Sequence, residues 1–479
     1  MQKNNHSDKY HSDKYHSDTI IALATPQGTG AIAVIRLSGE DCITITNRFF
    51  KGKNLTKQST HTLHFGTIRN EKDEIIDEVL VSIFIAPSSF TGENCIEISS
   101  HGSPYIVQKI LQLFMDNGVR HARAGEFTLR AFLNGRIDLS QAEAVADLIA
   151  SDSEASLQTA LKQMRGGFSN EIKILRTELI NFASLIELEL DFAEEDVEFA
   201  NREQFKALLE KLLTAIVRLV DSFRIGNVIK KGVSTVIAGR PNAGKSTLLN
   251  ALLNEERAIV SEIAGTTRDT IEEAININGI TFRLIDTAGI RAATDTIEAI
   301  GVQRTMEKIQ TASIVVYVFD VTQTDLSQAQ QDVANFIKSD VSSVIVLANK
   351  MDLKHNINNI STESLIENPL KIFSQKYQEI PFSSKNSQDI EKLKNTLWNT
   401  VAYDFGTDQT LVTNARHYEA LQGAAKSIKI VLDGVAQNQL TDLLAQDIRV
   451  ALGYLSEITG EITNDDLLIN IFSKFCIGK

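Results

Sequence analysis

The chain has 479 residues, which suggests about three domains, and its 43% hydrophobic and 23% charged residues are ordinary for a globular protein. No apolar run approaches the roughly 18 residues of a membrane-spanning helix, so a membrane role is not expected. The formal net charge of −13 disfavours a stand-alone nucleic-acid binder, and three widely separated cysteines fit a reducing cytoplasm better than a zinc site or a disulfide framework.

The first 18 residues consist largely of a polar repeat. His-Ser-Asp-Lys-Tyr occurs twice over residues 6–15, and residues 16–18 begin a third copy. Such a repeat cannot bury a core, so we predict a disordered tail over 1–18. A His-rich metal-binding tract is the alternative, and the lack of an apolar segment argues against a signal peptide.

Residues 19–136 are predicted to form a compact α/β unit. Apolar runs predict strands at 19–24, 30–36, 77–86 and 95–99, and a helix is predicted over 104–115 with Pro104 in its first turn. Four distinctive stretches lie within or after these elements: Ser89 to Glu93, His101-Gly102, Gly125 to Thr128 and Ala131 to Gly135.

Two segments on either side of the centre are predicted to be helical. Apolar residues recur at three- and four-residue steps through 137–231 and again through 405–479. We expect one discontinuous helical domain with 232–404 inserted as a loop, because the termini of α/β domains often lie close together. The acidic run 187–198 is interpreted as a solvated face, with a partner surface as the alternative.

The inserted segment begins with a phosphate-binding loop. The apolar run 233–238 predicts a buried strand, Gly239 to Ser246 follows it, and the residues after Ser246 have helical spacing. The glycines let backbone N–H groups face phosphate oxygens, Lys245 is the expected catalytic cation at the terminal phosphates, and the Ser246 hydroxyl can ligate Mg²⁺. The predicted nucleotide contacts here are Asn242, Ala243, Gly244, Lys245, Ser246 and Thr247.

Two later strands end in residues that fit a guanine nucleotide. The strand from Phe282 ends in Asp286, Thr287, Ala288 and Gly289. Asp286 is placed to hold Mg²⁺ through water, and the Gly289 N–H to sense the γ-phosphate. The strand 343–348 precedes Asn349-Lys350-Met351-Asp352. The Asp352 carboxylate can accept from both N1–H and the exocyclic amine of guanine, whereas adenine offers no such pair of donors.

A short loop completes the pattern. Asn349 and Lys350, which precede Asp352, are expected to pack on the base and brace the loop there, and Ser383-Ser384-Lys385 resembles the loop that contacts the guanine oxygen. Four such stretches in this order resemble a Ras-like GTPase domain, with GTP and Mg²⁺ as its ligands.

The switch regions indicate an unusual mode of hydrolysis. Gly265-Thr266-Thr267-Arg268-Asp269 lies where the first switch belongs, and Thr267 is the expected second Mg²⁺ hydroxyl. Ras-type enzymes orient the attacking water with a Gln after Asp-Thr-Ala-Gly, but Ile290 occupies that position here. An aliphatic side chain cannot orient water, so catalysis needs another source.

This pattern resembles GTPases whose two G domains face each other and trap K⁺ beside the phosphates. By that resemblance Asn242 is a K⁺ ligand, and a loop that supplies Ser261, Ile263 and Thr266 as further ligands wraps the ion. The whole loop is Ser261, Glu262, Ile263, Ala264, Gly265 and Thr266. Glu298 is the catalytic candidate that positions water through a relay, and an ordinary solvated helix carboxylate is the alternative.

The motifs together resemble one family. The four N-terminal stretches, the phosphate-binding loop and the switch sequence are similar to those of the tRNA modification GTPase family MnmE, also called TrmE. Gln141-Ala142-Glu143-Ala144 and the terminal Phe475-Cys476-Ile477-Gly478-Lys479 fit it too. The resemblance runs from about residue 19 to the last residue.

The resemblance implies that 19–136 is a folate-binding domain that forms a constitutive homodimer. The implied ligand is 5-formyltetrahydrofolate or a related tetrahydrofolate, the one-carbon source. Carried over by position, the pocket residues are Arg36, Glu97 and Arg136, with the terminal Lys479 reaching in. Arg136 replaces a Lys of some members, which keeps the charge but changes the geometry. Without the resemblance, both arginines would be interpreted as surface residues.

The implied function is tRNA modification. With the FAD-binding partner MnmG, in a heterotetramer, the chain would add an aminomethyl-type (carboxymethylaminomethyl) group at C5 of the wobble uridine. GTP hydrolysis would open and close the paired G domains, and the helices would communicate that movement. The alternative is a ribosome-assembly or signalling GTPase that acts as a switch without modification chemistry.

The chain ends in Cys476-Ile477-Gly478-Lys479, in which Gly478 and Lys479 argue against a prenylation signal. Cys476 is a catalytic candidate, because a thiolate can attack an electrophilic carbon; a merely buried thiol is the alternative.

Overall fold

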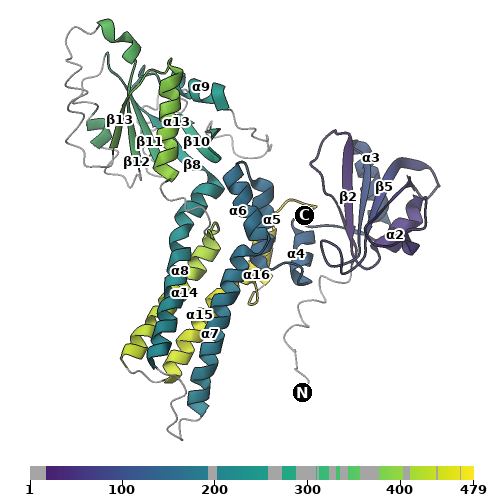
Figure 1. Ribbon diagram of the computed structural model, residues 1–479. Helices are drawn as coiled ribbons and strands as arrows, with labels where there is room; N and C mark the ends of the chain where they lie inside the picture. The colour runs from purple at the N-terminus through teal and green to yellow at the C-terminus, as the bar shows by residue number, and fades with distance from the viewer. Residues whose placement is uncertain are drawn as a thin grey trace, which may run out of the picture. The chain divides into compact units, whose positions relative to one another are not determined.

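The computed structural model divides into two compact units (Figure 1). The first contains 1–146, 163–212 and 423–479, and the second contains 147–162 and 213–422. The described residues are 18–191, 202–256, 272–286, 309, 312–322, 329, 331–334, 343–356, 377–402, 410–437, 441–463 and 465–478. All but the last residue of the predicted tail therefore lie outside the described part.

The first unit begins with a seven-stranded sheet in the order β3-β4-β5-β6-β2-β1-β7. Its strands are β1 (Ile20–Leu23), β2 (Ile32–Ser38), β3 (Phe50–Lys51), β4 (Thr62–Arg69), β5 (Ile75–Phe84), β6 (Cys95–His101) and β7 (Arg120–His121). Neighbours are antiparallel except for β1 and β7, which are parallel. Helices α2 (Cys42–Phe49) and α3 (Pro104–Asp116) bury one face of the sheet, and a short 3₁₀ turn, η1 (Leu55–Lys57), follows β3.

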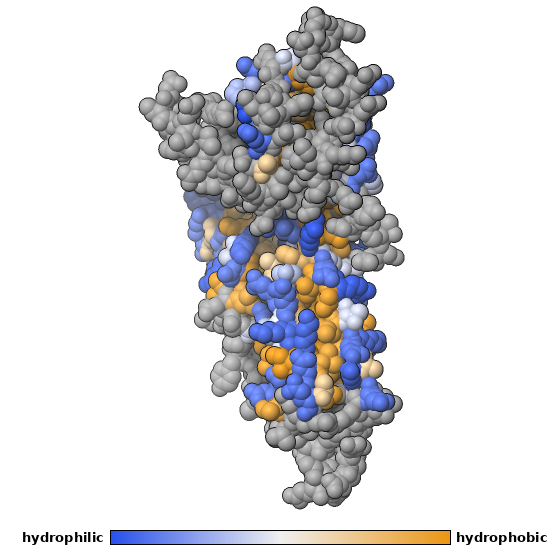
Figure 2. Space-filling model, turned by 90° about the vertical axis from the view of Figure 1, so that its left-hand side faces the viewer, coloured by the Kyte–Doolittle hydropathy of each residue, from blue (hydrophilic) through white to orange (hydrophobic). Residues whose placement is uncertain are grey.

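The helices that precede and follow residues 232–404 lie in the first unit or are divided between the two units. They are α4 (Glu126–Leu133), α5 (Leu139–Ala150), α6 (Glu154–Met164), α7 (Gly167–Asp191), α8 (Arg202–Lys231), α14 (Ala415–Ala436), α15 (Thr441–Thr459) and α16 (Asp465–Phe472). Helix α7 lies along α15, where Arg176 Nε donates to Ser456 Oγ at 2.8 Å. Helices α5, α6, α8 and α14 each continue from one unit into the other. Figure 2 shows one face, on which apolar side chains form a stripe between hydrophilic ones.

The second unit holds a six-stranded sheet in the order β13-β12-β11-β8-β10-β9. The strands are β8 (Val233–Ala238), β9 (Glu272–Ile277), β10 (Ile280–Asp286), β11 (Ile314–Asp320), β12 (Ser343–Asn349) and β13 (Tyr377–Pro381). All neighbours are parallel except β9 and β10. Helices α9 (Lys245–Glu256) and α13 (Ser387–Ala402) join the apolar core on one face, and the turn η4 (Met351–Asn356) follows β12.

The predicted fold class is confirmed: an α/β N-terminal part, helices from both sides of the insertion, and a P-loop sheet. The predicted N-terminal strands are present with shifted ends; the third, for example, runs from Ile75 to Phe84. Among the elements that were not predicted are α2, β4 and the fully buried β11. Because β8, β11, β12 and β13 are parallel, their carboxyl ends share one edge of the sheet, where ligands of α/β proteins bind.

Candidate functional site

The loop after β8 has the backbone geometry of a phosphate cradle. Gly239 has φ +150° and Gly244 φ +99°, and Asn242 is left-handed at φ +62°. A Cβ at Gly239 would lie 2.1 Å from the Val318 carbonyl oxygen, and one at Gly244 would lie 2.3 Å from Asn349 Nδ2. No side chain fits at either glycine, so the loop can follow this path only with glycine there.

Lys245, the first residue of α9, is held against this loop. Its Nζ donates to the carbonyl oxygens of Gly239 and Arg240, each at 2.9 Å, and the residue is only 8% exposed. A buried ammonium group beside a glycine-bounded loop and a helix N-terminus is suited to bind phosphate. These features fit a bound nucleoside triphosphate.

Asn349, at the end of β12, ties two loops of the site together. Its Nδ2 donates to the Ala243 carbonyl at 2.8 Å, and its Oδ1 accepts from the backbone N–H of Ser384 at 3.1 Å and from Ser384 Oγ at 3.0 Å. The residue is buried. Asn349 therefore joins the phosphate loop to the Ser383–Lys385 loop, and these bonds are the means by which it could brace the site.

Lys350 is braced by an acid that the sequence interpretation missed. Its Nζ lies 2.6 Å from Asp320 Oδ2, and Asp320 Oδ1 accepts from the N–H and Oγ1 of Thr322 at 2.9 and 2.7 Å. Burial alone raises the pKa of Asp320, but the bonds from Lys350 and Thr322 outweigh it and hold the pKa below its usual value. A signal existed, because Asp320 ends an apolar strand at the ligand-binding edge of the sheet.

Asp352 is positioned by the loop that was predicted to contact the guanine oxygen. Ser383 Oγ donates to Asp352 Oδ1 at 2.8 Å, and Lys385 Nζ lies 3.9 Å from its Oδ2. Ser383 is fixed in turn, since its N–H donates to Asp389 Oδ2 at 2.9 Å. The side chain of Asp352 is 35% exposed, so a base can reach its carboxylate.

Other predicted residues fall outside the described part of the chain. These are the loop Ser261–Thr267, Thr287, Ala288, Gly289, Ile290, Glu298 and Lys479. The backbone of Asp286 is described as the last residue of β10, but its side chain is not. Ser246 and Thr247 are exposed at the start of α9.

Arg36 and Glu97 meet on the N-terminal sheet. They are paired across β2 and β6, and Arg36 Nη2 and Nε lie 2.8 and 2.9 Å from Glu97 Oε1. The Arg36 guanidinium carbon lies 5.5 Å from the ring centre of Phe90 and 5.7 Å from that of Phe127. An ion pair between two aromatic rings offers both charge and stacking surface to a flat heterocycle.

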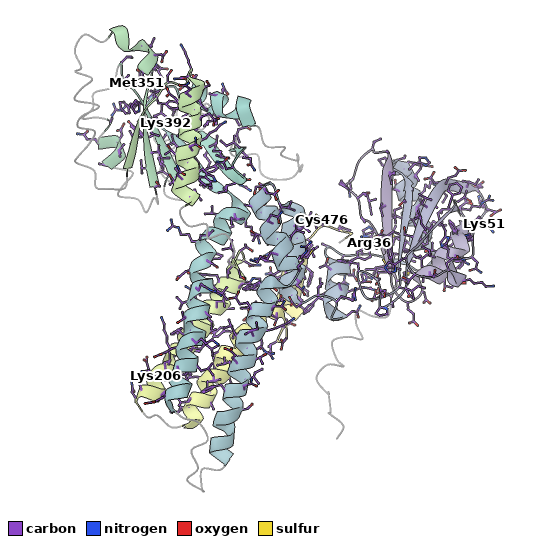
Figure 3. All side chains as sticks on the ribbon, viewed as in Figure 1. Arg36, Lys51, Lys206, Met351, Lys392 and Cys476 are labelled. Carbon is purple, nitrogen blue, oxygen red and sulfur yellow. The ribbon has the colours of Figure 1, made fainter. Side chains whose placement is uncertain are left out.

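The end of the chain lies against the same place. Arg36 Nη1 donates to the Gly478 carbonyl at 3.5 Å, and a Cβ at Gly478 would lie 2.1 Å from the Leu23 carbonyl oxygen. Ile477 forms a β-bridge with Ala124. Figure 3 labels Arg36 and, on this C-terminal stretch, Cys476, which is exposed. The alternative of a merely buried Cys476 thiol is therefore wrong.

The loop Phe90–Glu93, whose Phe90 ring lies beside Arg36, is held by a buried charge network that the sequence did not predict. Arg130 is 0% exposed, and its Nη1 lies 3.1 Å from Glu93 Oε2 and 2.9 Å from the Asp18 carbonyl. Glu93 Oε2 also accepts from Ser38 Oγ at 2.7 Å.

The same loop lies beside Arg136, the second predicted arginine of the pocket. A Cβ at Gly92 would lie 3.1 Å from Arg136 Cγ, and Asn134 Nδ2 donates to the Thr91 carbonyl at 2.7 Å. The structure therefore places Arg136 beside the loop that carries Phe90, whose ring contacts Arg36.

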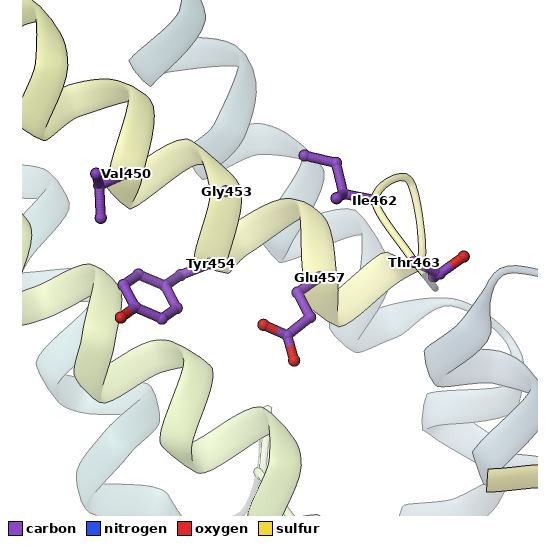
Figure 4. A pocket seen from close by; sticks show the side chains of 6 residues that line it. All are labelled: Val450, Gly453, Tyr454, Glu457, Ile462 and Thr463. Atoms are coloured by element: carbon purple, nitrogen blue, oxygen red, sulfur yellow. The ribbon is translucent and has the colours of Figure 1, made fainter. Parts of the chain in front are cut away.

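A separate pocket of about 470 Å³ lies on α15 and the turn after it (Figure 4). Its lining residues are Val450, Gly453, Tyr454, Glu457, Ile462 and Thr463. None of the predicted site residues lines it. Within the described residues, no helix could cross a membrane, and no group of three or more His, Cys, Asp or Glu could hold a metal ion.

Comparisons with known proteins cover nearly the whole chain. A family model described as the GTP-binding protein TrmE N-terminus matches residues 19–136, and one described as the MnmE helical domain matches 139–476. A relative from Cytophaga hutchinsonii named "tRNA modification GTPase MnmE" is 56% identical, over 96% of this chain and 98% of its own length. Relatives of the same name from Flavobacterium psychrophilum and Bacteroides thetaiotaomicron are 55% and 50% identical, each over 96% of this chain and 99% of theirs.

Proposed function

This chain belongs to the MnmE family of tRNA modification GTPases, and we propose that it hydrolyses GTP within a complex that modifies the wobble uridine of tRNA. The observation that supports the nucleotide part is the junction at Asn349, which joins the phosphate loop to the Ser383–Lys385 loop. Family membership favours modification over the ribosome-assembly or signalling alternative.

The chain's own residues would bind the nucleotide at the carboxyl edge of the second sheet. Lys245 and the backbone of Asn242 to Gly244 would bind the phosphates, and Ser246 would ligate Mg²⁺. Asp352 would accept two hydrogen bonds from guanine, while Asn349 and Lys350 would hold the loops around the base. Mg²⁺ would neutralise charge that develops on the phosphates.

We assign hydrolysis to a closed pair of G domains, because Ile290 cannot orient water. Asn242 and the loop Ser261–Thr266 would bind K⁺, which would supply positive charge beside the phosphates. Glu298 would position the attacking water through a relay. The left-handed backbone of Asn242, at φ +62°, turns the chain within the phosphate loop, which is compatible with an ion ligand there.

The N-terminal sheet would bind the tetrahydrofolate donor. A Glu97 carboxylate can accept from a pterin amine and ring N–H, and the cations of Arg36 and Arg136 suit the glutamate tail. Phe90 and Phe127 flank Arg36 closely enough to contribute a stacking surface. Lys479, one residue beyond Gly478, would reach the same pocket.

The same sheet would form the homodimer. On its outer face, Leu80 pairs across the strands with Phe65 on one side and with Ser99 on the other, next to the row that holds Glu97 and Arg36. Phe65 is 66% exposed and Leu63 58% exposed. An apolar patch of this kind on an otherwise polar surface marks an interface, and it would place two folate sites near each other.

The chemistry on tRNA would need a second protein. The FAD-binding partner MnmG would supply the redox step, the folate would supply one carbon, and the product would be an aminomethyl-type group at uridine C5. Exposed Cys476 lies on the stretch that runs past Arg36 and is the candidate nucleophile of this chain. The net charge of −13 favours a partner that holds the tRNA.

Nucleoside analysis of tRNA tests the whole proposal. A strain that lacks the protein should lose carboxymethylaminomethyl-type wobble uridines and regain them from a plasmid copy, but not from a Lys245→Ala copy. Unchanged wobble nucleosides in the deletion strain would reject modification and favour the switch alternative. Purified protein should hydrolyse GTP and leave ATP intact, and equal turnover of both would reject the nucleotide assignment.

A further inference from the structure

The corner between α5 and α6 is bonded to the β9–β10 hairpin of the P-loop sheet. Thr281 Oγ1 donates to Asp152 Oδ1 at 3.0 Å, and Arg283 Nη2 lies 3.8 Å from Asp152 Oδ2. The backbone N–H of Ala155, in the first turn of α6, donates to the Gly279 carbonyl at 3.2 Å. One carboxylate and one amide thus fasten the tip of the hairpin, and all these residues belong to the second unit.

The hairpin lies between the two predicted switch regions along the chain. The predicted first switch, 265–269, precedes β9, and β10 ends at Asp286, which begins the Asp-Thr-Ala-Gly stretch. Thr281 and Asp286 are five residues apart in one strand, so they are separated by about 17 Å.

Strand β10 is well suited to transmit a displacement. Phe282 and Leu284 are buried, and the strand pairs with β8 from Phe282 to Asp286 and with β9 from Ile280 to Ile285. A strand that is paired on both sides and packed in a core moves as a body rather than bending. A shift at its Asp286 end would therefore be felt at Thr281.

The helical side of the contact is equally fixed. Asp147, near the end of α5, lies 2.8 Å from Lys230 Nζ near the end of α8. Ser153 Oγ accepts from the Ser156 N–H at 3.2 Å and so caps the start of α6. The corner cannot follow the hairpin without moving these helices.

We propose that Asp152 is a positioning residue that couples the nucleotide state of the GTPase part to the helices through Thr281. This inference rests on the proposed GTP hydrolysis and names the contact by which it reaches the helices. Because coupling is reciprocal, a partner that displaces α5 or α6 would also bias the nucleotide site.

Hydrogen exchange of the full-length protein tests this contact directly. The probe is the amide exchange of residues 152–160, which include the Ala155 N–H, measured with GDP and with a non-hydrolysable GTP analogue. In the wild-type protein the two nucleotides should give rates that differ by about threefold or more. Asp152→Ala and Thr281→Val should remove that difference while GTP affinity stays within about twofold.

Two variants separate coupling from simple loss of stability. Asp152→Asn keeps an acceptor for Thr281 and should retain part of the nucleotide-dependent difference. Glu154→Gln makes the same charge change two residues away, where the side chain is bonded to Gln158, and should retain all of it. A merely structural role for Asp152 would speed exchange equally with both nucleotides and leave their ratio unchanged.

Two results would overturn the inference: no nucleotide-dependent difference in a wild-type protein that binds GTP, or an unchanged difference in Asp152→Ala. Either leaves the proposed function standing. Failure of the wild-type protein to bind GTP would instead reject the proposed function itself.

Discussion

The Nδ2 of Asn349 donates to the Ala243 carbonyl at 2.8 Å, which binds the end of β12 to the phosphate loop. The same side chain accepts from Ser384, so phosphate recognition and base recognition are parts of one hydrogen-bonded structure. A disturbance at the base loop is therefore expected to reach the phosphates.

Asn349→Ala should weaken nucleotide binding without removing any group proposed to touch the phosphates. It leaves the Ala243 carbonyl and the Ser384 N–H without their partner, at a cost of about 1–3 kcal/mol, or roughly five- to 150-fold in GTP affinity. Titration with a fluorescent GTP analogue measures this. Asn386→Ala, an exposed Asn in the adjacent loop whose side-chain Oδ1 accepts from the Gln388 N–H, is the control and should change little. Equal affinities for all three proteins would contradict the bracing role.

Asp352→Asn should change which base is bound. The carboxylate is proposed to accept two donors of guanine, and an amide presents one donor in place of an acceptor. Loss of a hydrogen bond to a charged group costs about 1.5–3 kcal/mol, so GTP affinity should fall by at least about tenfold. Xanthosine triphosphate, which carries a carbonyl where guanine has its amine, should gain affinity. Competition of GTP and xanthosine triphosphate against labelled GDP measures the change in base preference, and ATP is the control, whose binding should stay weak. A variant that still prefers GTP over the xanthosine nucleotide would rule out base contact by Asp352.

Asp320→Asn should remove a pH-dependent part of the stability. The pKa of Asp320 is depressed in the folded protein, so its contribution is fully present above the unfolded value near about 3.9 and is lost as pH falls through the folded pKa. At pH 7 the variant should be less stable by about 1–3 kcal/mol, because Lys350 loses its charged partner.

Thermal unfolding of the wild-type and Asp320→Asn proteins between pH 7 and pH 2 measures this. The gap between their midpoints should be constant down to about pH 4 and narrow below it. Asp116→Asn, an exposed Asp that accepts from Gln112, should show no such gap. A gap that stays constant to pH 2 would mean that the charge of Asp320 does not contribute.

The parts of the site that the sequence predicted are those whose chemistry requires neighbours in the chain. A phosphate loop needs its glycines, Lys245 and Ser246 in one short stretch, so it can be recognised without a structure. Asp320 and Arg130 were missed because their partners are distant: Lys350 is 30 residues from Asp320, and Glu93 is 37 residues from Arg130. Arg36 and Glu97 needed the family resemblance for the same reason.

The missed elements have local causes. In strand β4 the large apolar residues Leu63 and Phe65 are exposed, whereas the polar His64 is buried. Its sequence pattern therefore does not predict a buried apolar face. Helix α2 is rich in β-branched Ile and Thr, which disfavour helix, and its packing on the sheet overrides that preference. Strand β11 is apolar throughout, so periodicity alone cannot assign it.

Arg130→Ala should destabilise the N-terminal sheet strongly. Arg130 lies within hydrogen-bond reach of Glu93 and Glu126, and its removal leaves buried carboxylates uncompensated, at a cost of about 3–5 kcal/mol. Thermal unfolding should show a lower midpoint, and tetrahydrofolate binding should weaken because the Phe90–Glu93 loop loses its support.

Arg48→Ala, an exposed arginine of α2, is the control and should be nearly neutral. Arg130→Lys should recover part of the stability, since it restores one charge without the two-pronged geometry. A midpoint unchanged in Arg130→Ala would show that the network contributes nothing to the fold.

The potassium proposal makes the sharpest kinetic prediction. Replacing K⁺ with Na⁺, which is too small to fill the proposed ligand set, should lower GTP turnover by about a hundredfold, because loss of one preorganised electrostatic interaction with the transition state costs about 2.7–4 kcal/mol. Asn242→Ala should do the same in K⁺, but Asn242 has φ +62°, so alanine also strains the loop. Asn242→Gly removes the amide without that strain and should show the same loss.

Asn250→Ala, an exposed Asn of α9, is the control and should keep full turnover in K⁺. GTP affinity should stay within about threefold in every variant, since K⁺ acts on the transition state rather than on binding. If Asn242→Gly hydrolyses GTP as fast as the wild-type protein in K⁺, Asn242 is not an ion ligand, and the charge that replaces the missing glutamine must come from elsewhere.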